Sequence, residues 1–125
     1  MDQAQISQIG QQFVQSYYQT FDTNRAALVQ LYRPESQLYF EGSHILGAQA
    51  IVEKLMTLTF RTIQHAITTA DSQLTVDGGL VVFVVGQLKT DEDQILGFSQ
   101  TFYVKQFGNS LFVMNDLFRL SLHHQ

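Results

Sequence analysis

The fold is decided by a run of six apolar residues, Leu80-Val81-Val82-Phe83-Val84-Val85, which follows the turn Asp77-Gly78-Gly79. These turn residues are typical of a tight hairpin, so the run is predicted to be a β-strand. A strand of an antiparallel sheet with one wet face alternates apolar and polar residues, and this run does not. Its second face must therefore be covered. We expect the same sheet of a second copy to cover it across a two-fold axis; the alternative is a strand buried wholly within one chain.

Further strands are predicted on both sides of this run. Before it, Ile63, His65 and Ile67 alternate with polar residues and share one face of a strand. After it, the chain turns at Thr90-Asp91-Glu92-Asp93. Two long strands follow, roughly Gln94–Lys105 and Leu111–Leu120, joined by a turn at Phe107–Ser110. The second half of the chain is therefore predicted to form an antiparallel meander.

The first half of the chain shows helical periodicity. In a helix predicted to run to about Thr20, apolar residues recur every three or four positions: Ile6, Ile9, Phe13, Tyr17 and Phe21. A second, short helix is expected to be capped by Asp22 or Thr23 and ended by Pro34. A hairpin at Leu38–Leu46 and a third helix around Ala50–Leu58 come next. Helices followed by a meander predict an α+β fold with N-terminal helices packed on an antiparallel sheet.

Composition limits the class of protein. The 125 residues fit one domain, 1–125, and no linker or repeat divides them. Charged residues make up only 14%, below the usual ~25%, which again favours self-association. The net charge of −4 argues against a nucleic-acid partner, and the absence of cysteine excludes disulfides and zinc–thiolate sites. With no signal peptide and no apolar run of ~20 residues, we expect a soluble intracellular protein without a membrane partner.

Two ionisable residues that face inward are candidates for acid–base chemistry. His65 lies in phase with its apolar neighbours, and a buried Asp116 would need a partner, which His65 or Arg119 could supply. Without a nucleophile motif or a metal-ligand cluster, we interpret both as pocket or core residues, and His123-His124 as a frayed tail. Asp116 is predicted to share its column with the apolar residues Phe112, Met114, Phe118 and Leu120.

The acidic turn Asp91-Glu92-Asp93 is a candidate binding element. Such turns are usually only solvated, but this one joins two strands that are expected near the centre of the sheet. Glu41 occupies a second turn, directly after the apolar Phe40. We therefore expect an apolar pocket with an acidic rim.

Seven stretches of the chain resemble the nuclear transport factor two family. They are Tyr17-Tyr18-Gln19-Thr20-Phe21-Asp22, Phe40-Glu41-Gly42, Ala50-Ile51-Val52-Glu53-Lys54-Leu55, Ile63-Gln64-His65, Val85-Gly86-Gln87-Leu88 with Asp91-Glu92-Asp93, and Asn115-Asp116-Leu117-Phe118-Arg119-Leu120. The resemblance implies a cone-like α+β homodimer with a strongly bent sheet and a hydrophobic pocket. It also implies a carrier that takes the GDP-bound small GTPase Ran into the nucleus and binds phenylalanine-glycine repeats of nuclear pore proteins. Such a carrier would be found in the cytoplasm, in the nucleus and at nuclear pores.

The resemblance also implies roles for single residues. The positions that pair with basic residues of Ran are Glu41, Asp91 and Asp93. The lining that accepts an aromatic side chain of Ran is Phe40, Leu58, Ile63, Leu96 and Phe118, with His65 as a wall residue. Ile6 matches a position that binds the pore repeats, and Asp22 matches one near the Ran or pore contacts. Ile6 and Phe40 both stand where the family commonly has tryptophan.

The family's fold also houses enzymes, so two alternatives remain. One is a small-molecule isomerase or dehydratase that uses His65, Asp116 or a pocket tyrosine as acid and base. The other is a scaffold domain of the same fold that binds other peptides. Because the resemblance to the carrier extends along the whole chain, we expect a non-enzymatic protein without a cofactor or a bound metal.

Overall fold

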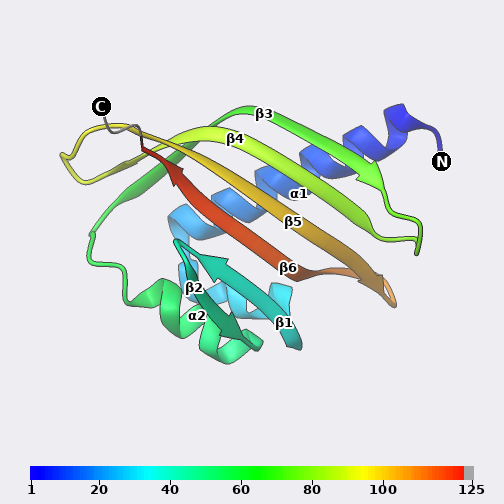
Figure 1. Cartoon of the computed structure of the whole chain (residues 1–125), viewed down its shortest axis with the longest axis horizontal. Helices are drawn as coiled ribbons and strands as arrows, with labels where there is room; N and C mark the ends of the chain where they lie inside the picture. The colour runs from blue at the N-terminus through cyan, green and yellow to red at the C-terminus, as the bar shows by residue number, and fades with distance from the viewer. Residues whose placement is uncertain (123–125) are drawn as a thin grey trace.

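The computed structural model describes residues 1–122 and shows helices packed on one face of a curved sheet (Figure 1). α1 runs along β3, and α2 packs against β1 beside the β1–β2 hairpin. The α+β architecture predicted from the sequence is confirmed. In chain order the elements are α1 (Gln3–Thr23), the 3₁₀ helix η1 (Arg25–Leu31), β1 (Tyr32–Phe40), β2 (Ser43–Leu46), α2 (Ala48–Met56), β3 (Ile63–Leu74), β4 (Leu80–Thr90), β5 (Leu96–Phe107) and β6 (Ser110–Ser121).

The strands form one sheet in the order β2-β1-β6-β5-β4-β3. Neighbouring strands are antiparallel except β1 and β6, which run parallel where Gln37–Phe40 pair with Asn115–Phe118. The prediction of a wholly antiparallel sheet is therefore wrong at this pair. The reason is the α2 crossover, which returns the chain so that β3 runs in the direction of β2. After the hairpins that follow, β6 runs in the direction of β1.

α1 begins with a capping box and presents its apolar stripe to the sheet. The Asp2 carboxylate accepts the Gln5 backbone N–H at 2.9 Å, and the Gln5 side chain accepts the Asp2 N–H at 3.0 Å. Gly10 allows close approach to β3, because a Cβ there would lie 1.8 Å from Ser72 Oγ. Although α1 has 21 residues, none of the described helices is long and apolar enough to cross a membrane.

The chain after α1 differs from its prediction. Asp22 lies inside α1, and η1 begins at Arg25 without a side-chain cap, so Asp22 does not cap a second helix. Pro34 lies within β1, where the pairing with β6 shifts register, and does not end a helix. A shift in register tolerates proline because a ladder hydrogen bond is already missing there.

The two faces of β4 have different surroundings. Leu80, Val82 and Val84 are at most 7% exposed and belong to the core under α1. Phe83 points to the opposite face and is 43% exposed. Cross-strand pairing places Phe83 in one row with Leu117 and Tyr39, which are also exposed. The apolar run therefore supplies both the core and an apolar row on the outer face of the sheet, the face away from α1.

A bulge in β6 changes which residues share a face with Asp116. The pairing with β5 shifts register between Val113 and Asn115, so Met114 is the extra residue. Val113 is fully buried, whereas Phe112 and Met114 are only half-buried. The prediction that Phe112 and Met114 share the column of Asp116 is therefore wrong. On the far side of the bulge, Phe118 and Leu120 keep the alternation that the sequence predicts.

Candidate functional site

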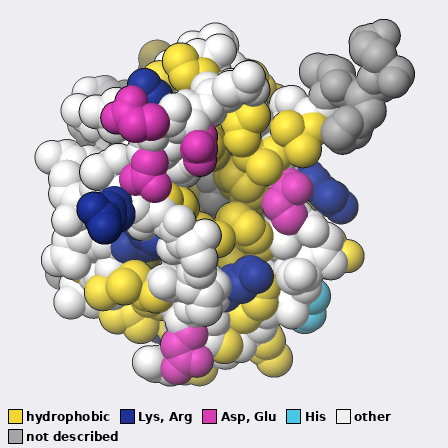
Figure 2. Space-filling model, turned by 90° about the vertical axis from the view of Figure 1, so that its left-hand side faces the viewer, with side chains coloured by type: hydrophobic (Ala, Val, Ile, Leu, Met, Phe, Trp, Pro, Cys, Tyr) yellow, Lys and Arg dark blue, Asp and Glu magenta, His cyan; other side chains and the backbone are white. Residues whose placement is uncertain are grey.

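An apolar pocket opens at one end of the molecule, between the sheet and the helices. Its cavity has a volume of about 240 Å³, and Figure 2 shows a hollow lined by hydrophobic side chains with acidic side chains on two sides. The structure places all of the predicted lining residues here: Phe40, Leu58, Ile63, His65, Leu96 and Phe118. The lining is completed by Tyr17, Phe21, Leu38, Glu41, Leu55, Phe60, Leu88, Thr90, Gln100, Asp116 and Leu120.

One wall of the pocket is built from stacked aromatic rings. Phe40 of β1 and Phe118 of β6 are neighbours in the parallel pair, and their ring centroids lie 4.8 Å apart at 7°. Phe118 also stacks on Phe98 of β5, with 5.7 Å between centroids. The parallel pairing of β1 and β6 thus gives the pocket a flat apolar wall, suited to another flat apolar group.

The floor of the pocket is a buried hydrogen-bond network around Asp116. Gln100 Nε2 donates to Asp116 Oδ1 at 2.7 Å, and Tyr32 OH donates to Asp116 Oδ2 at 2.8 Å. Tyr17 OH lies 2.7 Å from Tyr32 OH, and Tyr18 OH donates to Gln100 Oε1. Because the Tyr32 proton is directed to the carboxylate, Tyr17 is left to donate to Tyr32. Every member of the network thus has a partner.

Burial and this network set the ionisation of the floor. Asp116 is 2% exposed, and desolvation raises its pKa from 3.8 to about 6, although donation from Gln100 and Tyr32 opposes the rise. The pKa values of Tyr17 and Tyr32 are raised well above 10.0, first by burial and then by the Asp116 charge. Both phenols therefore remain donors at neutral pH, while the carboxylate stays the acceptor.

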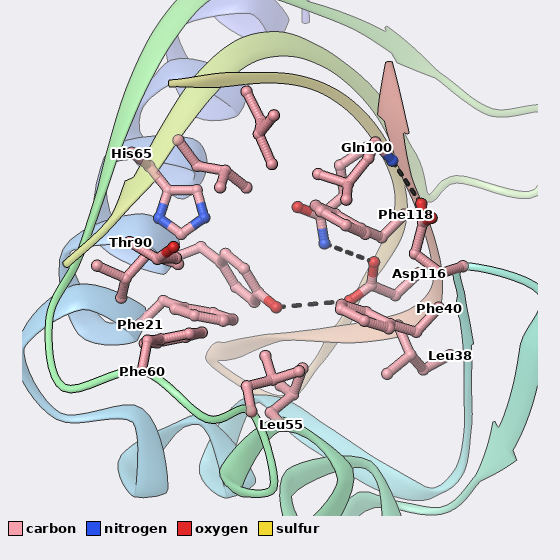
Figure 3. A pocket seen from close by; sticks show the side chains of 17 residues that line it. Phe21, Leu38, Phe40, Leu55, Phe60, His65, Thr90, Gln100, Asp116 and Phe118 are labelled. Carbon is pink, nitrogen blue, oxygen red and sulfur yellow. Dashed lines mark hydrogen bonds between the residues drawn. The ribbon is translucent and has the colours of Figure 1, made fainter. Parts of the chain in front are cut away.

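His65 and Asp116 line the same pocket but do not pair. Figure 3 shows them on opposite sides of the pocket. His65 is instead bonded to Asp22 of α1. Asp22 Oδ1 lies 2.6 Å from His65 Nδ1, and Asp22 Oδ2 accepts the His65 backbone N–H at 3.0 Å. The hypothesis that His65 or Arg119 partners Asp116 is wrong. Tyrosine hydroxyls and an amide, all uncharged, take that place.

Glu41 forms one side of the pocket rim and is tied to β6. It has a left-handed backbone conformation with φ of 49°. Its N–H donates to Phe118 O at 3.2 Å, and its Oε1 accepts the backbone N–H of Leu120. One carboxylate oxygen is therefore used to hold the strand, and Oε2 accepts no hydrogen bond from residues 1–122.

The acidic turn, Asp91-Glu92-Asp93, directly follows the pocket-lining Thr90, but its three side chains are not among the residues that line the cavity. Asp91 also has a left-handed backbone, with φ of 50°, and its Oδ1 accepts the backbone N–H groups of Arg61 and Thr62 at 3.0 and 2.9 Å. These backbone hydrogen bonds lower the pKa of Asp91 below 3.8. Asp93 Oδ2 accepts only a long bond, 3.4 Å, from Thr90 Oγ1.

The two residues assigned to pore-repeat binding lie at opposite ends of α1. Ile6 is 5% exposed and lines a small hollow of about 80 Å³ together with Met1, Ile9 and Leu74. Asp22 is 16 residues further along, which is about 24 Å at 1.5 Å per helical residue. Its carboxylate is committed to His65. The structure therefore does not bring Ile6 and Asp22 together on one chain.

Several lining residues were not assigned to the site from the sequence. Tyr17 and Phe21 were recognised as the apolar stripe of the helix, but not as pocket residues. Gln100 alternates with the fully buried Phe98 and Phe102, which is the signal that it faces inward. Phe60 lies in an irregular segment, so no periodicity indicated which way it points.

No metal site is recognisable in residues 1–122, where no group of three His, Cys, Asp or Glu side chains is placed so that it could hold a metal ion. His123-His124, interpreted as a tail, lies outside the described residues. The polar side chains of the floor are bonded to one another, and His65 and Glu41 are bonded to groups beside the pocket. The arrangement is suited to holding an apolar group between aromatic walls, with carboxylates at the mouth.

Comparison with known proteins gives consistent matches along the chain. A family model described as the nuclear transport factor 2 (NTF2) domain matches residues 9–120. Nuclear transport factor 2 of Schizosaccharomyces pombe is 46% identical over 120 residues, which is 94% of this chain and 98% of that protein. The solved structure of nuclear transport factor 2 from Cryptosporidium parvum is 47% identical, with a TM-score of 0.89 over 94% of this chain and 95% of that chain.

An enzyme-related structure matches at much lower identity. A putative scytalone dehydratase from Novosphingobium aromaticivorans has a TM-score of 0.76 and 14% identity, over 92% of this chain and 85% of that chain. At that identity the likeness shows a shared fold and nothing about chemistry.

Proposed function

The chain belongs to the nuclear transport factor 2 family, and from that premise we propose that it is a nuclear import carrier for the GDP-bound small GTPase Ran. It is a transport factor and not one of the enzymes that share its fold. We place it in the cytoplasm and the nucleus, at nuclear pores, where it binds phenylalanine-glycine repeats of pore proteins. The observation that carries the proposal is an apolar pocket with carboxylates on two sides of its mouth.

The pocket is proposed to receive an aromatic side chain of Ran. Its stacked Phe40 and Phe118 wall, with Leu58, Ile63 and Leu96, offers apolar contact on several sides, and His65 adds an edge. Burial of one phenylalanine side chain contributes roughly 1.5–3 kcal/mol. The polar floor is saturated by its own bonds, so an apolar ring leaves none of its groups unpaired.

The rim is proposed to pair with basic residues of Ran through Glu41, Asp91 and Asp93. Glu41 and Asp91 are oriented by bonds that they accept from backbone N–H groups of distant residues, and each keeps one oxygen for a partner. A preoriented carboxylate loses little entropy on pairing, and charge pairs at a partly desolvated rim select the partner and its orientation.

The repeat-binding site is proposed to lie at the start of α1. Ile6 borders an apolar hollow with Ile9 and Leu74, into which a phenylalanine of a repeat would pack. Asp22, at the other end of α1, would contact the pore repeats at a place separate from the Ile6 hollow. Ile6→Ala is expected to weaken binding of a repeat peptide and to leave Ran binding unchanged. Equal loss of both partners would show that the site lies elsewhere.

The protein is proposed to be a homodimer that packs through the outer face of its sheet. Phe83, Leu117 and Tyr39, each more than 40% exposed, form an apolar row across that face. Light scattering is expected to give twice the chain mass of 14.2 kDa. Phe83→Asp, which puts a charge into the row, is expected to give the monomer mass. A wild-type monomer at micromolar concentration would exclude this interface.

The direct test is retention of Ran, loaded separately with GDP or GTP, on the immobilised protein. We expect retention of the GDP form and its loss in Glu41→Lys. Glu41→Gln keeps an acceptor for Leu120 N–H, so it isolates the charge and should bind more weakly than wild type. Glu53→Lys makes the same charge change on the exposed face of α2 and should bind normally. Full binding by Glu41→Lys, or no retention of Ran by wild type, would overturn the proposal.

A further inference from the structure

One wall of the pocket is a segment without regular structure, residues 57–62, here called the strap. It connects α2 to β3, and its side chains Leu58 and Phe60 line the pocket. Figure 3 shows Phe60 beside Phe21, on the side of the pocket opposite Phe40 and Phe118. The position of the strap therefore determines how far the pocket extends away from the β1–β6 wall.

The backbone of the strap is held only at its two ends. At the first end, Thr57 N–H and Oγ1 bond to Lys54 O in the last turn of α2. At the second, Asp91 accepts the N–H groups of Arg61 and Thr62 and donates its own N–H to Thr62 O. Among residues 1–122, no hydrogen bond reaches residues 58–60, the part that faces the pocket. Side-chain packing must hold that part.

Leu58 and Phe60 pack against the hydrophobic core, and Arg25 of η1 adds a contact from outside it. Its guanidinium lies over the Phe60 ring, 4.3 Å from the centroid, and 5.2 Å from the centroid of Phe21. Arg25 Nη1 also donates to Leu55 O at 3.0 Å, one of the carbonyls left free where α2 ends. One planar cation thus joins η1, the end of α1, the end of α2 and the strap.

Two features of the environment of Arg25 are unfavourable for the stability of the fold. Its Nε is buried and has no hydrogen-bond partner among the described residues. Desolvation lowers its pKa, with the Asp22 charge in opposition. A buried donor without a partner is unfavourable, and departures of this kind are concentrated at functional sites. The stacking on two pocket-lining rings is the contact that the arginine gains there.

We propose that Arg25 is a positioning residue, which holds Phe60 and the strap against the pocket and so sets the size of the aromatic ring that the pocket accepts. The inference rests on the proposed function only in taking the pocket as a site for an aromatic side chain. Without Arg25 the strap moves outward, and the affinity of the pocket for rings larger than that of phenylalanine rises relative to its affinity for phenylalanine.

The test measures ring preference with small probes, toluene for a phenylalanine side chain and 3-methylindole for a tryptophan side chain. Wild type is expected to bind toluene more tightly than 3-methylindole. In Arg25→Met, the dissociation constant for 3-methylindole divided by that for toluene is expected to fall by about tenfold or more. Arg25→Lys keeps a cation over Phe60 but lacks the planar guanidinium, so its ratio of dissociation constants should lie between those of wild type and Arg25→Met. Thermal unfolding of each variant reports stability separately.

Arg33→Met is the matched control. Arg33 lies over Phe107, 3.9 Å from the ring centroid, and thus makes the same kind of contact outside the pocket. Its variant should lower the melting temperature without a change in the toluene to 3-methylindole ratio. An Arg25→Met protein that melts earlier but keeps the wild-type ratio would overturn the proposal. So would a wild-type protein that binds neither probe.

Hydrogen exchange provides a second measurement. Arg25→Met is expected to speed exchange of the amides of Arg61 and Thr62, which donate to Asp91 Oδ1 at the end of the strap, by about tenfold or more relative to amides in the middle of α1. A uniform increase over the whole chain would mean that Arg25 is only a stabilising residue, and would overturn the proposal. Neither measurement uses Ran, so a failure of the proposed function leaves both results interpretable.

Discussion

Two aspartates lie in opposite environments, Asp116 on the floor of the pocket and Asp91 in the acidic turn that we propose as part of the rim. Asp116 on the floor is 2% exposed, and burial raises its pKa to about 6. Asp91 lies on the rim, where hydrogen bonds from the Thr62 and Arg61 backbone lower its pKa. The same side chain is thus a weaker acid on the floor and a stronger acid on the rim.

The two aspartates also differ in what they leave for a partner. Both oxygens of Asp116 accept hydrogen bonds from Gln100 and the tyrosines, so this carboxylate has a structural role and offers no free acceptor to a ligand. Asp91 uses Oδ1 for the strap and keeps Oδ2 free of bonds among the described residues, and Glu41 on the opposite rim is arranged in the same way. A bound partner therefore meets charge at the mouth of the pocket and saturated groups at its floor.

The largest effect is expected from removal of the floor carboxylate. Asp116→Leu leaves Tyr32 and Gln100 with buried donors and no acceptor, and should lower the free energy of unfolding by about 3–5 kcal/mol. Urea denaturation at fixed protomer concentration measures this. Asp116→Asn retains an acceptor and removes the desolvated charge, so its loss should be much smaller. An equal loss of unfolding free energy in both variants would show that the hydrogen-bond network does not stabilise the floor.

The pH dependence of stability should separate floor from rim. The folded pKa of Asp116 lies above its unfolded value of 3.8, so the native protein binds more protons between pH ~4 and ~6. The contribution of Asp116 to the free energy of unfolding is therefore greatest below pH ~4 and is lost as the pH rises through ~6. Because one pKa unit corresponds to about 1.4 kcal/mol, the change from 3.8 to about 6 corresponds to about 3 kcal/mol.

The measurement is urea denaturation of wild type and Asp116→Asn at several pH values between about 4 and 7. Wild type should gain stability relative to the variant as the pH falls through this range. Asp91 has the opposite sign, because its lowered pKa gives a contribution that is present above pH ~3.8 and is lost only below it. If wild type loses stability relative to Asp116→Asn on acidification, the pKa of Asp116 is lowered by folding and not raised.

A smaller effect, on binding, is expected from the rim. Asp91→Asn keeps an oxygen for the Arg61 and Thr62 amides and tolerates the left-handed backbone, so it removes only the charge. Its affinity for Ran-GDP should fall about tenfold. Asp91→Ala also releases the strap and should bind more weakly than Asp91→Asn. Equal affinity of the two variants, measured by calorimetry, would show that the anchoring bonds of Asp91 contribute nothing to recognition.

The sequence predicted the apolar wall of the pocket better than its floor. The residues of the apolar wall could be found because strand alternation and the family resemblance agree on them, as at Ile63 and Phe118. The partners of Asp116 could not, because Tyr17, Tyr32 and Gln100 come from three separate elements that only the folded sheet brings together. The Met114 bulge also shifts the alternation on which a column of β6 residues depends.

Local rules were insufficient for Asp22 and Asp91 for a related reason. Aspartate after a predicted helix is a normal cap, yet Asp22 remains inside α1 and bonds to His65, 43 residues away. Asp91 could be recognised as part of a turn, but its bonds to Arg61 and Thr62 depend on how the α2–β3 segment folds back. Long-range pairs of this kind leave no periodic signal in the sequence.

The smallest effect is expected from Glu92, in the middle of the acidic turn. It carries the same charge as Asp91 but is exposed, and no hydrogen bond among residues 1–122 orients its side chain. A freely moving exposed carboxylate contributes little to a charge pair, because water screens it and its side-chain entropy must be lost. Glu92→Gln should therefore change the affinity for Ran-GDP by no more than about twofold, with a modest loss of association rate at low salt. If Glu92→Gln and Asp91→Asn weaken binding equally at physiological salt, total charge governs the rim and the anchoring of its carboxylates does not.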